Sequence, residues 1–173
     1  MPPQVVLVGL PGAGKSTTGR RLAKLLLVPF ADTDDLVEKS AGRSVRDIFA
    51  ADGECEFRRV EAEAIAAALR DFGGVLALGG GALTTAGTRE SLAASGIPVV
   101  LLRASVSTLS VRVGDAASRP LLADDPSARL AVLADEREPL YRAAATFTVD
   151  TDHRTPAQVA AQVAARLHEK ATT

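Results

Sequence analysis

Short apolar runs alternate with longer amphipathic segments along this chain of 173 residues. A run of four or five apolar residues is typical of a buried parallel strand, and apolar residues at every third or fourth position are typical of a helix that covers a sheet. The expected strands are Val5–Val8, Val28–Ala31, Val75–Leu78, Val99–Leu102 and Phe147–Val149. The expected helices are Lys15–Leu27, Asp35–Ser40, Ser44–Ala51, Glu54–Arg70, Thr88–Ala94, one that Ser105 caps and that reaches Val113, Pro126–Arg142, and one that Thr155 caps and Pro156 begins.

This alternation of strands and helices predicts an α/β fold, a three-layer α/β/α sandwich with a five-stranded parallel sheet. We expect a single domain over residues 1–173, because no linker, repeat or low-complexity tract interrupts the pattern. One stretch, 114–125, has no regular pattern. Its small and polar residues surround Arg119-Pro120-Leu121-Leu122, and they indicate a mobile surface loop.

Composition and charge narrow the possible partners. The chain is 47% apolar and 24% charged, as expected of a folded protein, and its formal net charge of −1 provides no overall field that attracts nucleic acid or an anionic membrane. No apolar run approaches the roughly 18 residues that cross a bilayer, and no signal-peptide pattern precedes the first strand. We therefore expect a cytoplasmic protein without nucleic-acid or membrane partners.

Cysteine and aromatic residues are few. Cys55 is the only cysteine, which excludes an intrachain disulfide and a Cys-rich metal site. The chain contains five Phe, one Tyr and no Trp, and it shows no obvious apolar surface stripe. This scarcity favours a monomer.

The most specific motif lies between the first strand and the first helix. The sequence Gly9-Leu10-Pro11-Gly12-Ala13-Gly14-Lys15-Ser16-Thr17 matches G-x-x-x-x-G-K-[ST]. Its glycines let backbone N–H groups surround phosphate oxygens, Lys15 reaches the β- and γ-phosphates, and the Ser16 hydroxyl binds Mg²⁺. The alternative is a glycine-rich turn before a capped helix. No Asn-Lys-x-Asp segment is present, which argues against a GTPase.

Two carboxylates follow the second strand, where open α/β sheets bind ligands. Asp32 and Asp34 alternate along an extended segment, so that one can face a metal ion while the other faces an acceptor hydroxyl. The alternative is that Asp34 only caps the helix that begins at Asp35.

Arginines and glycines complete the candidate acceptor region. Arg58 and Glu61 form either an exposed i,i+3 pair or a fork for a substrate carboxylate, oriented by Glu61. The triple glycine 79–81 indicates either a tight turn or a ligand that closely approaches the backbone. Arg119 is either an exposed loop charge or a residue that closes over the transferred phosphate.

In order along the chain, these residues resemble the shikimate kinase family, part of the P-loop group that resembles nucleoside monophosphate kinases. The stretches that carry the resemblance are Gly9–Thr17, Asp32-Thr33-Asp34, Gly42-Arg43-Ser44 with Ile48-Phe49, Gly53-Glu54 with Glu56-Phe57-Arg58, Leu78-Gly79-Gly80-Gly81, Arg119-Pro120-Leu121-Leu122, Arg137 with Pro139-Leu140-Tyr141, and Val149-Asp150-Thr151. The resemblance implies a P-loop NTPase fold with strand order 2-3-1-4-5. It also implies ATP and shikimate as substrates, Mg²⁺ as cofactor, a lid at about 114–125 and a shikimate-binding helical region at about 34–62.

The resemblance also implies a role for each matching residue. On the nucleotide side these are Gly12, Ala13, Gly14, Lys15, Ser16 and Thr17 for the ATP phosphates, Ser16 and (through water) Asp32 for Mg²⁺, Arg119 as the lid arginine, and Arg112 and Arg154 near the adenine. On the acceptor side they are Asp34 as the base at the 3-hydroxyl, Arg58 and Arg137 at the shikimate carboxylate, Gly80 and Gly81 as N–H donors, Glu61 as support for Arg58, and Phe49 and Phe57 as pocket lining.

Two other functions fit parts of the pattern. A gluconate kinase also phosphorylates a hydroxy acid, but the paired Arg58 and Arg137 with the triple glycine favour shikimate. A non-catalytic nucleotide-sensing module is the other alternative. Because Lys15, Asp34 and Arg119 are all present, the sequence favours an enzyme.

Overall fold

The computed structural model describes residues 1–114 and 126–171. Its elements in chain order are β1 (Val5–Val8), α1 (Lys15–Leu26), β2 (Phe30–Asp32), α2 (Thr33–Ala41), α3 (Val45–Asp71), β3 (Val75–Ala77), the 3₁₀ turn η1 (Ala82–Thr84), α4 (Ala86–Ser95), β4 (Val99–Arg103), α5 (Val106–Gly114), α6 (Pro126–Ala144), β5 (Phe147–Asp150) and α7 (Pro156–Ala171). Within these ranges, no helix is both long and apolar enough to cross a membrane.

The five strands form one parallel sheet in the order β2-β3-β1-β4-β5. The central strand β1 is buried along its whole length, and Val6 pairs with Leu76 on one side and with Val99 on the other. A strand that is covered on both faces needs apolar residues at every position, which explains the continuous run Val5–Val8. The predicted fold class and strand order are confirmed.

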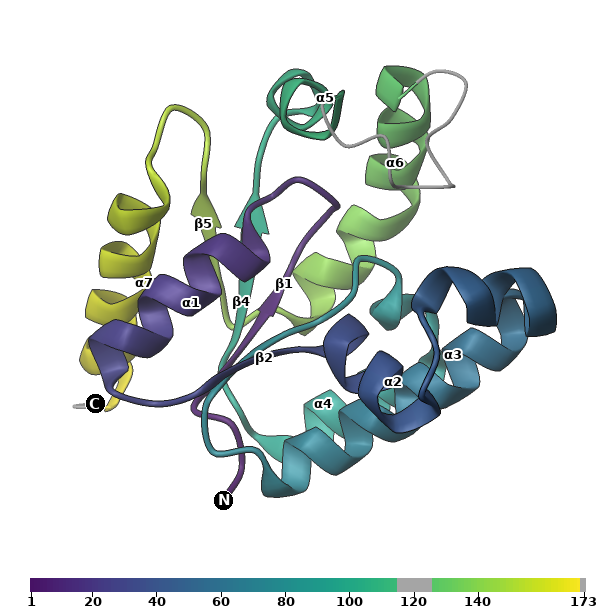
Figure 1. The fold of residues 1–173 in the computed structure, drawn as a ribbon. Coiled ribbons are helices and arrows are strands. Elements are labelled where there is room, and N and C mark those ends of the chain that lie inside the picture. Colours follow the sequence, from purple (N-terminus) through teal and green to yellow (C-terminus); the bar gives the residue numbers. More distant parts are fainter. Residues whose placement is uncertain (115–125, 172–173) are drawn as a thin grey trace.

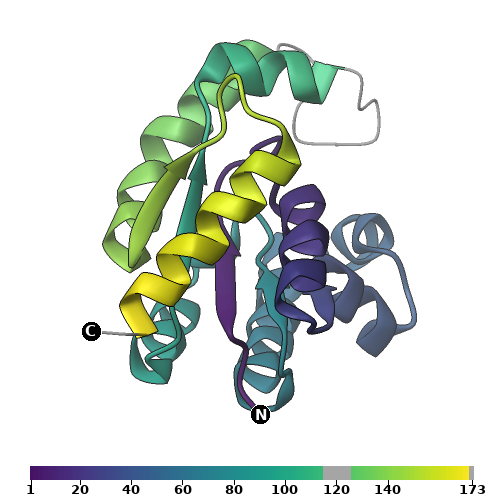
Figure 2. The same cartoon turned by 90° about the vertical axis from the view of Figure 1, so that its left-hand side faces the viewer.

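Helices cover both faces of the sheet (Figures 1 and 2). Helices α1 and α7 pack together on one face, and α3, α4 and α6 lie on the other. Their buried apolar residues meet the strands in one large core, whose helical members include Leu22, Ile65, Leu92, Leu130 and Val163. The three layers therefore bury the apolar stripe of each helix against the sheet.

A second, smaller core lies outside the large one. Val37, Ile48 and Phe57 form this core between α2 and α3, and Phe49 packs against its edge. We call residues 33–64 the α2–α3 unit. Helix α3 is interrupted at Gly53, where φ is 82° and ψ is 176°, so the two separate helices predicted from the sequence meet at this break.

Several local features differ from the sequence-based expectations. Strand β2 begins at Phe30 instead of Val28, because the Val28 N–H still donates to the Ala23 carbonyl (3.0 Å) and closes the end of α1. The short turn η1 has no counterpart in the apolar pattern. The residue that caps α2 is Asp32 and not Asp34. The Asp32 side chain accepts a hydrogen bond from the Asp34 N–H (3.2 Å). The predicted lid residue Arg119 lies outside the described residues.

Candidate active site

The phosphate loop, residues 9–17, connects β1 to α1 at the carboxyl end of the sheet. Gly12 and Gly14 adopt left-handed φ values of 82° and 89°, which side chains rarely tolerate. Gly14 is also the N-cap residue of α1, and as a glycine it has no side chain that could accept a hydrogen bond from the first turn of that helix. The loop therefore leads into a helix N-terminus whose N–H groups and dipole favour an anion.

The two polar side chains at the start of α1 have defined partners. Lys15 Nζ donates to the carbonyls of Gly9 (2.8 Å) and Leu10 (3.1 Å), so its ammonium lies inside the curve of the loop. Ser16 Oγ donates to Asp32 Oδ2 at 2.6 Å. The hydroxyl and carboxylate that the sequence predicts for Mg²⁺ are thus side by side, although 16 positions separate them. Both are hard oxygen ligands of the kind that Mg²⁺ prefers.

A cavity of about 500 Å³ opens beside the phosphate loop. Its lining comprises residues 12–18, Arg112, Thr151, Arg154, Pro156 and Val159. Arg112 from α5 donates to Thr151 Oγ1 (3.0 Å), to the Thr151 carbonyl (3.0 Å) and to the Gly12 carbonyl (3.3 Å). The structure therefore brings the two arginines predicted near the adenine to the wall of the same cavity as the phosphate loop. We call it the nucleotide cavity.

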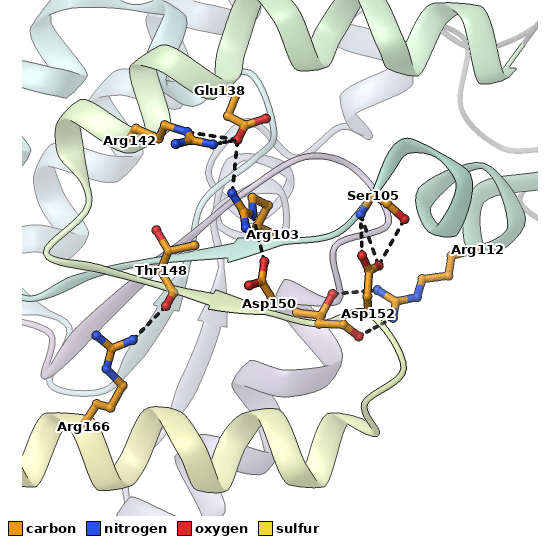
Figure 3. Close-up of polar contacts among 10 residues, drawn as sticks. Arg103, Ser105, Arg112, Glu138, Arg142, Thr148, Asp150, Asp152 and Arg166 are labelled. Carbon is orange, nitrogen blue, oxygen red and sulfur yellow. Dashed lines mark hydrogen bonds and ion pairs between the residues drawn. The ribbon is translucent and has the colours of Figure 1, made fainter.

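Helix α5 is attached at both ends to the turn 151–155 that follows β5 (Figure 3). At its start, the Ser105 N–H donates to both oxygens of Asp152 at 3.1 Å, and at its end Arg112 reaches Thr151. Hydrogen bonds from the Thr108 hydroxyl and from Ser105 hold the pKa of the Asp152 carboxyl below its ordinary value. Asp152 gives no signal in the sequence, because its partner Ser105 lies 47 positions away.

A chain of ion pairs lies beside this turn (Figure 3). Arg103 at the end of β4 contacts Asp150 (2.8 Å) and Glu138 (4.0 Å), and Glu138 contacts Arg142 (2.6 Å). Only the i,i+4 spacing of Glu138 and Arg142 could have been found in the sequence. Because these side chains are partly exposed, each pair contributes little to stability, about 0–1 kcal/mol.

The acceptor side contains a buried ion pair on α3. Arg58 Nη1 and Glu61 Oε2 are 2.6 Å apart, and their side chains are only 14% and 1% exposed. Burial raises the pKa of the Glu61 carboxyl, and the neighbouring Arg58 opposes this effect. The ring of Phe57 lies beneath the guanidinium, 5.1 Å from Arg58 Cζ, and stacks on Phe49 with centroids 4.6 Å apart. The alternative of an exposed, solvated pair is therefore wrong.

The glycine loop, residues 79–81, is the point where the acceptor residues meet. A Cβ atom on Gly79 would lie 2.6 Å from Glu61 Oε1 and 2.9 Å from Asp34 Oδ1. One on Gly81 would overlap the guanidinium of Arg58.

The middle residue of the loop faces two further parts of the site. A Cβ atom on Gly80 would lie 3.1 Å from Pro11 Cδ of the phosphate loop and 3.6 Å from Arg137 Nη1. None of the three glycines has a left-handed φ, so the loop needs glycine for space and not for backbone conformation. The predicted acceptor residues Asp34, Arg58 and Arg137 thus surround one loop next to the phosphate loop.

Hydrogen bonds hold the glycine loop in place. The Gly79 N–H donates to Thr33 Oγ1 (2.8 Å), the Gly80 carbonyl accepts from the Tyr141 hydroxyl, and the Gly81 carbonyl accepts from Thr84. Within the described ranges, the N–H groups of Gly80 and Gly81 donate to no acceptor of the chain. Thr33 and Tyr141 lie in stretches that carry the family resemblance, but no role was predicted for them, because a single Thr or Tyr does not reveal from the sequence what it will contact.

A parallel sheet with a nucleotide cavity at its carboxyl end and an arginine-rich acceptor region beside it is typical of the P-loop kinases of small molecules. The family model described as shikimate kinase matches residues 11–168. The chain is 52% identical to the shikimate kinase of Mycobacterium avium over 96% of this chain and 94% of that protein. It therefore belongs to the shikimate kinase family, which confirms the resemblance and the enzyme class predicted from the sequence.

Solved structures agree with this family assignment. A shikimate kinase from Acinetobacter baumannii in complex with shikimate superposes with a TM-score of 0.92 and 35% identity, over 98% of this chain and 94% of that one. A gluconokinase from Sinorhizobium meliloti superposes with a TM-score of 0.65 and 20% identity, over 99% and 94% of the two chains. This second likeness extends to the fold alone.

Proposed function

We propose that this protein transfers the γ-phosphate of ATP to the 3-hydroxyl of shikimate and forms 3-phosphoshikimate and ADP, a step in the biosynthesis of chorismate and the aromatic amino acids. The observation that carries the proposal is the glycine loop, which Asp34, Arg58 and Arg137 surround and which Pro11 of the phosphate loop adjoins. This arrangement supports a carboxylate anchor, a base and a phosphate site within one region.

The nucleotide side binds and orients ATP. The N–H groups of residues 12–17 and the Lys15 ammonium hold the phosphates. Arg112 and Arg154 form the wall of the nucleotide cavity beside the adenine. Ser16 and, through water, Asp32 hold Mg²⁺, which supplies charge neutralisation at the β- and γ-phosphates. We propose that Arg119, outside the described residues, also contacts the phosphates.

The acceptor side binds a carboxylate and activates a hydroxyl. Arg58 and Arg137 both have little contact with solvent, so their hydrogen bonds to a substrate carboxylate are strong. The N–H groups of Gly80 and Gly81 are available as further donors, and Glu61 keeps the Arg58 guanidinium oriented. Phe57 supports Arg58 from below, and Phe49 supports Phe57.

The reaction proceeds in line. Asp34 accepts the proton of the 3-hydroxyl as that oxygen forms a bond to the γ-phosphorus, while the bond from the γ-phosphorus to the β,γ-bridging oxygen breaks. ADP leaves with the electron pair of the broken bond. Lys15 stabilises the negative charge that develops on the transferred group.

The acceptor side favours shikimate over gluconate. Two arginines with little exposure to solvent and a loop without side chains suit a compact ring carboxylate, and the similar shikimate kinase from Acinetobacter baumannii is known in complex with shikimate. We further propose that the enzyme is a cytoplasmic monomer without nucleic-acid or membrane partners, on the basis of its net charge of −1 and its few aromatic residues.

The test is ADP production by the purified chain with ATP and Mg²⁺, compared with shikimate, gluconate and no acceptor. We expect saturable ADP release with shikimate only, and its loss when EDTA removes the metal. ATP binding without shikimate-dependent ADP release would instead support the non-catalytic nucleotide-sensing alternative.

A further inference from the structure

The only tyrosine of the chain, Tyr141, lies between the glycine loop and Arg137 on the acceptor side. Tyr141 is 1% exposed. Its hydroxyl donates to the Gly80 carbonyl, and the Arg137 guanidinium lies close enough to lower the pKa of that hydroxyl by its charge and by hydrogen bonding. Arg137 and Tyr141 are four positions apart on α6, so they share one face of that helix.

The contact with Gly80 orients a donor as well as an acceptor. In a trans peptide the C=O of one residue and the N–H of the next point in opposite directions, and the chain contains no cis peptide within the described residues. Because Tyr141 holds the Gly80 carbonyl on one side, the Gly81 N–H points to the other. That N–H donates to no acceptor within the described ranges.

The contact with Arg137 fixes a charged side chain at the same time. Arg137 is 8% exposed, and its Nη1 is 3.6 Å from the Cβ position of Gly80. Burial raises the pKa of the Tyr141 hydroxyl to about 12, and Arg137 opposes that rise, so the hydroxyl keeps its proton and can donate and accept at once.

We propose that Tyr141 is a positioning residue for the acceptor, because its hydroxyl locks the Arg137 guanidinium and the Gly81 N–H into one arrangement. This inference rests on the proposed function, in which Arg137 binds the shikimate carboxylate and the glycine loop donates to the substrate. Tyr141 does not touch the nucleotide cavity, whose lining is formed by other residues. Loss of the Tyr141 hydroxyl should therefore change the KM for shikimate and not the KM for ATP.

The test is Tyr141→Phe, which removes one oxygen and keeps the buried ring. We expect the KM for shikimate to rise about 10-fold, the effect of one lost hydrogen bond to a charged group, with the KM for ATP unchanged. The matched control is Thr88→Val, because Thr88 Oγ1 is also buried and has no hydrogen-bond partner in the described part of the chain. This control should leave both KM values unchanged.

The outcomes separate the inference from the proposed function. If the wild type turns over shikimate and the shikimate KM is the same in wild type and Tyr141→Phe, the inference is overturned. The proposed function is then unaffected. An equal rise of both KM values also overturns the inference, since that indicates a general loss of structure. A wild type that releases no ADP with shikimate refutes the proposed function itself.

A second measurement uses the wild type and does not depend on how the variant folds. The chain contains no tryptophan, so its emission after excitation at 280 nm comes from Tyr141 alone. Binding of a carboxylate to Arg137 changes the charge next to the hydroxyl, and we expect a saturable change in emission during a shikimate titration. The change should be absent in Arg137→Leu. A flat titration at concentrations that saturate turnover contradicts the inference.

Discussion

Two glycine-rich loops lie side by side in this protein, and they need glycine for different reasons. In the phosphate loop, Gly12 and Gly14 have left-handed φ values that other residues adopt only under strain. In the glycine loop, the backbone is ordinary, but a Cβ atom at Gly79 or Gly81 would collide with Glu61, Asp34 or Arg58. In our proposal one loop curves its backbone around a phosphate, and the other leaves room for charged side chains.

This difference extends to the two ends of the active site. The phosphate loop is continuous in sequence and has the large core behind it. The acceptor end combines the α2–α3 unit, the glycine loop and α6, and the α2–α3 unit has a small core of its own. Substitutions at the acceptor end should therefore change the kinetics of shikimate and leave those of ATP nearly unaffected.

The largest effect is expected for Asp34→Asn. The amide cannot accept the hydroxyl proton, so kcat should fall about 100- to 10,000-fold while ATP binding stays near that of the wild type. Steady-state kinetics and a nucleotide titration measure both quantities. The control is Asp35→Asn on the same helix, which should keep its activity. Turnover of Asp34→Asn close to that of the wild type would contradict the role of Asp34 as the base.

Arg58→Ala should raise the KM for shikimate about 10- to 100-fold, because a substrate carboxylate loses hydrogen bonds to a charged partner. Removing Arg58 also leaves Glu61 buried without its cation, so the melting temperature should fall. The neighbouring Arg59→Ala removes an exposed residue that pairs with Glu56 and Glu63, and it should change neither value appreciably. An unchanged KM in Arg58→Ala would exclude Arg58 as a carboxylate anchor.

Gly81→Ala tests the difference between the two loops directly. The added methyl group must displace the Arg58 guanidinium, and we expect a rise in the shikimate KM of about 5- to 10-fold with little change for ATP. Gly87→Ala is the matched control, since a Cβ atom there would meet no atom within 4 Å. If Gly81→Ala binds shikimate normally, the loop does not need the space that we assign to it.

Asp152→Asn tests the nucleotide end. The amide loses charge-assisted hydrogen bonds to Ser105 and Thr108, and the turn 151–155 should hold Arg154 less firmly beside the nucleotide cavity. We expect the KM for ATP to rise about 2- to 5-fold with no change for shikimate. Asp150→Asn, which removes a partly exposed partner of Arg103, serves as the comparison. A change in the shikimate KM alone would show that the two ends are not separate.

Glu61→Gln should have the smallest effect of these substitutions. The affected quantity is the melting temperature, and the sign of its change depends on pH. Because the folded state raises the pKa of Glu61, its stabilising contribution is complete below the ordinary value of 4.5 and is lost as pH rises through the higher folded pKa. The melting temperature of the wild type should therefore fall relative to that of Glu61→Gln as the pH rises from 4 to 8. Each kcal/mol lost from the free energy of unfolding should lower it by about 2–4 °C. Glu63→Gln, an exposed control, should track the wild type. The opposite trend would mean that Arg58 outweighs burial.

Local sequence patterns accounted for most of the secondary structure, because apolar periodicity, N-caps and glycine breaks act over a few residues. Thr155 does cap α7, where its Oγ1 accepts from the Gln158 N–H (3.3 Å), and Gly53 does separate two helices. The errors occurred where another local hydrogen bond decides the boundary, as at Val28, which closes α1, and at Asp34, where Asp32 is the cap. Periodicity cannot distinguish these cases.

The acceptor site was predictable only with the help of a family resemblance. The phosphate loop is readable by itself, because one short segment contains the glycines, the lysine and the hydroxyl of the motif. Arg58 could not be separated from an exposed ion pair by its spacing alone, and Tyr141 gave no indication of its contacts. Their significance follows from burial and from glycine-loop neighbours that are distant in the chain, Gly81 for Arg58 and Gly80 for Tyr141.

The sequence by itself determined the α/β class, the phosphate loop and the family of this protein, since these depend on periodicity and on contiguous motifs. Only the tertiary structure decided that the glycine loop needs space instead of a special backbone conformation, that Glu61 is buried and Arg58 is mostly shielded from solvent, and that the Tyr141 hydroxyl donates to Gly80 beside Arg137. The physical reason is that burial and steric exclusion depend on segments that meet only after the chain has folded.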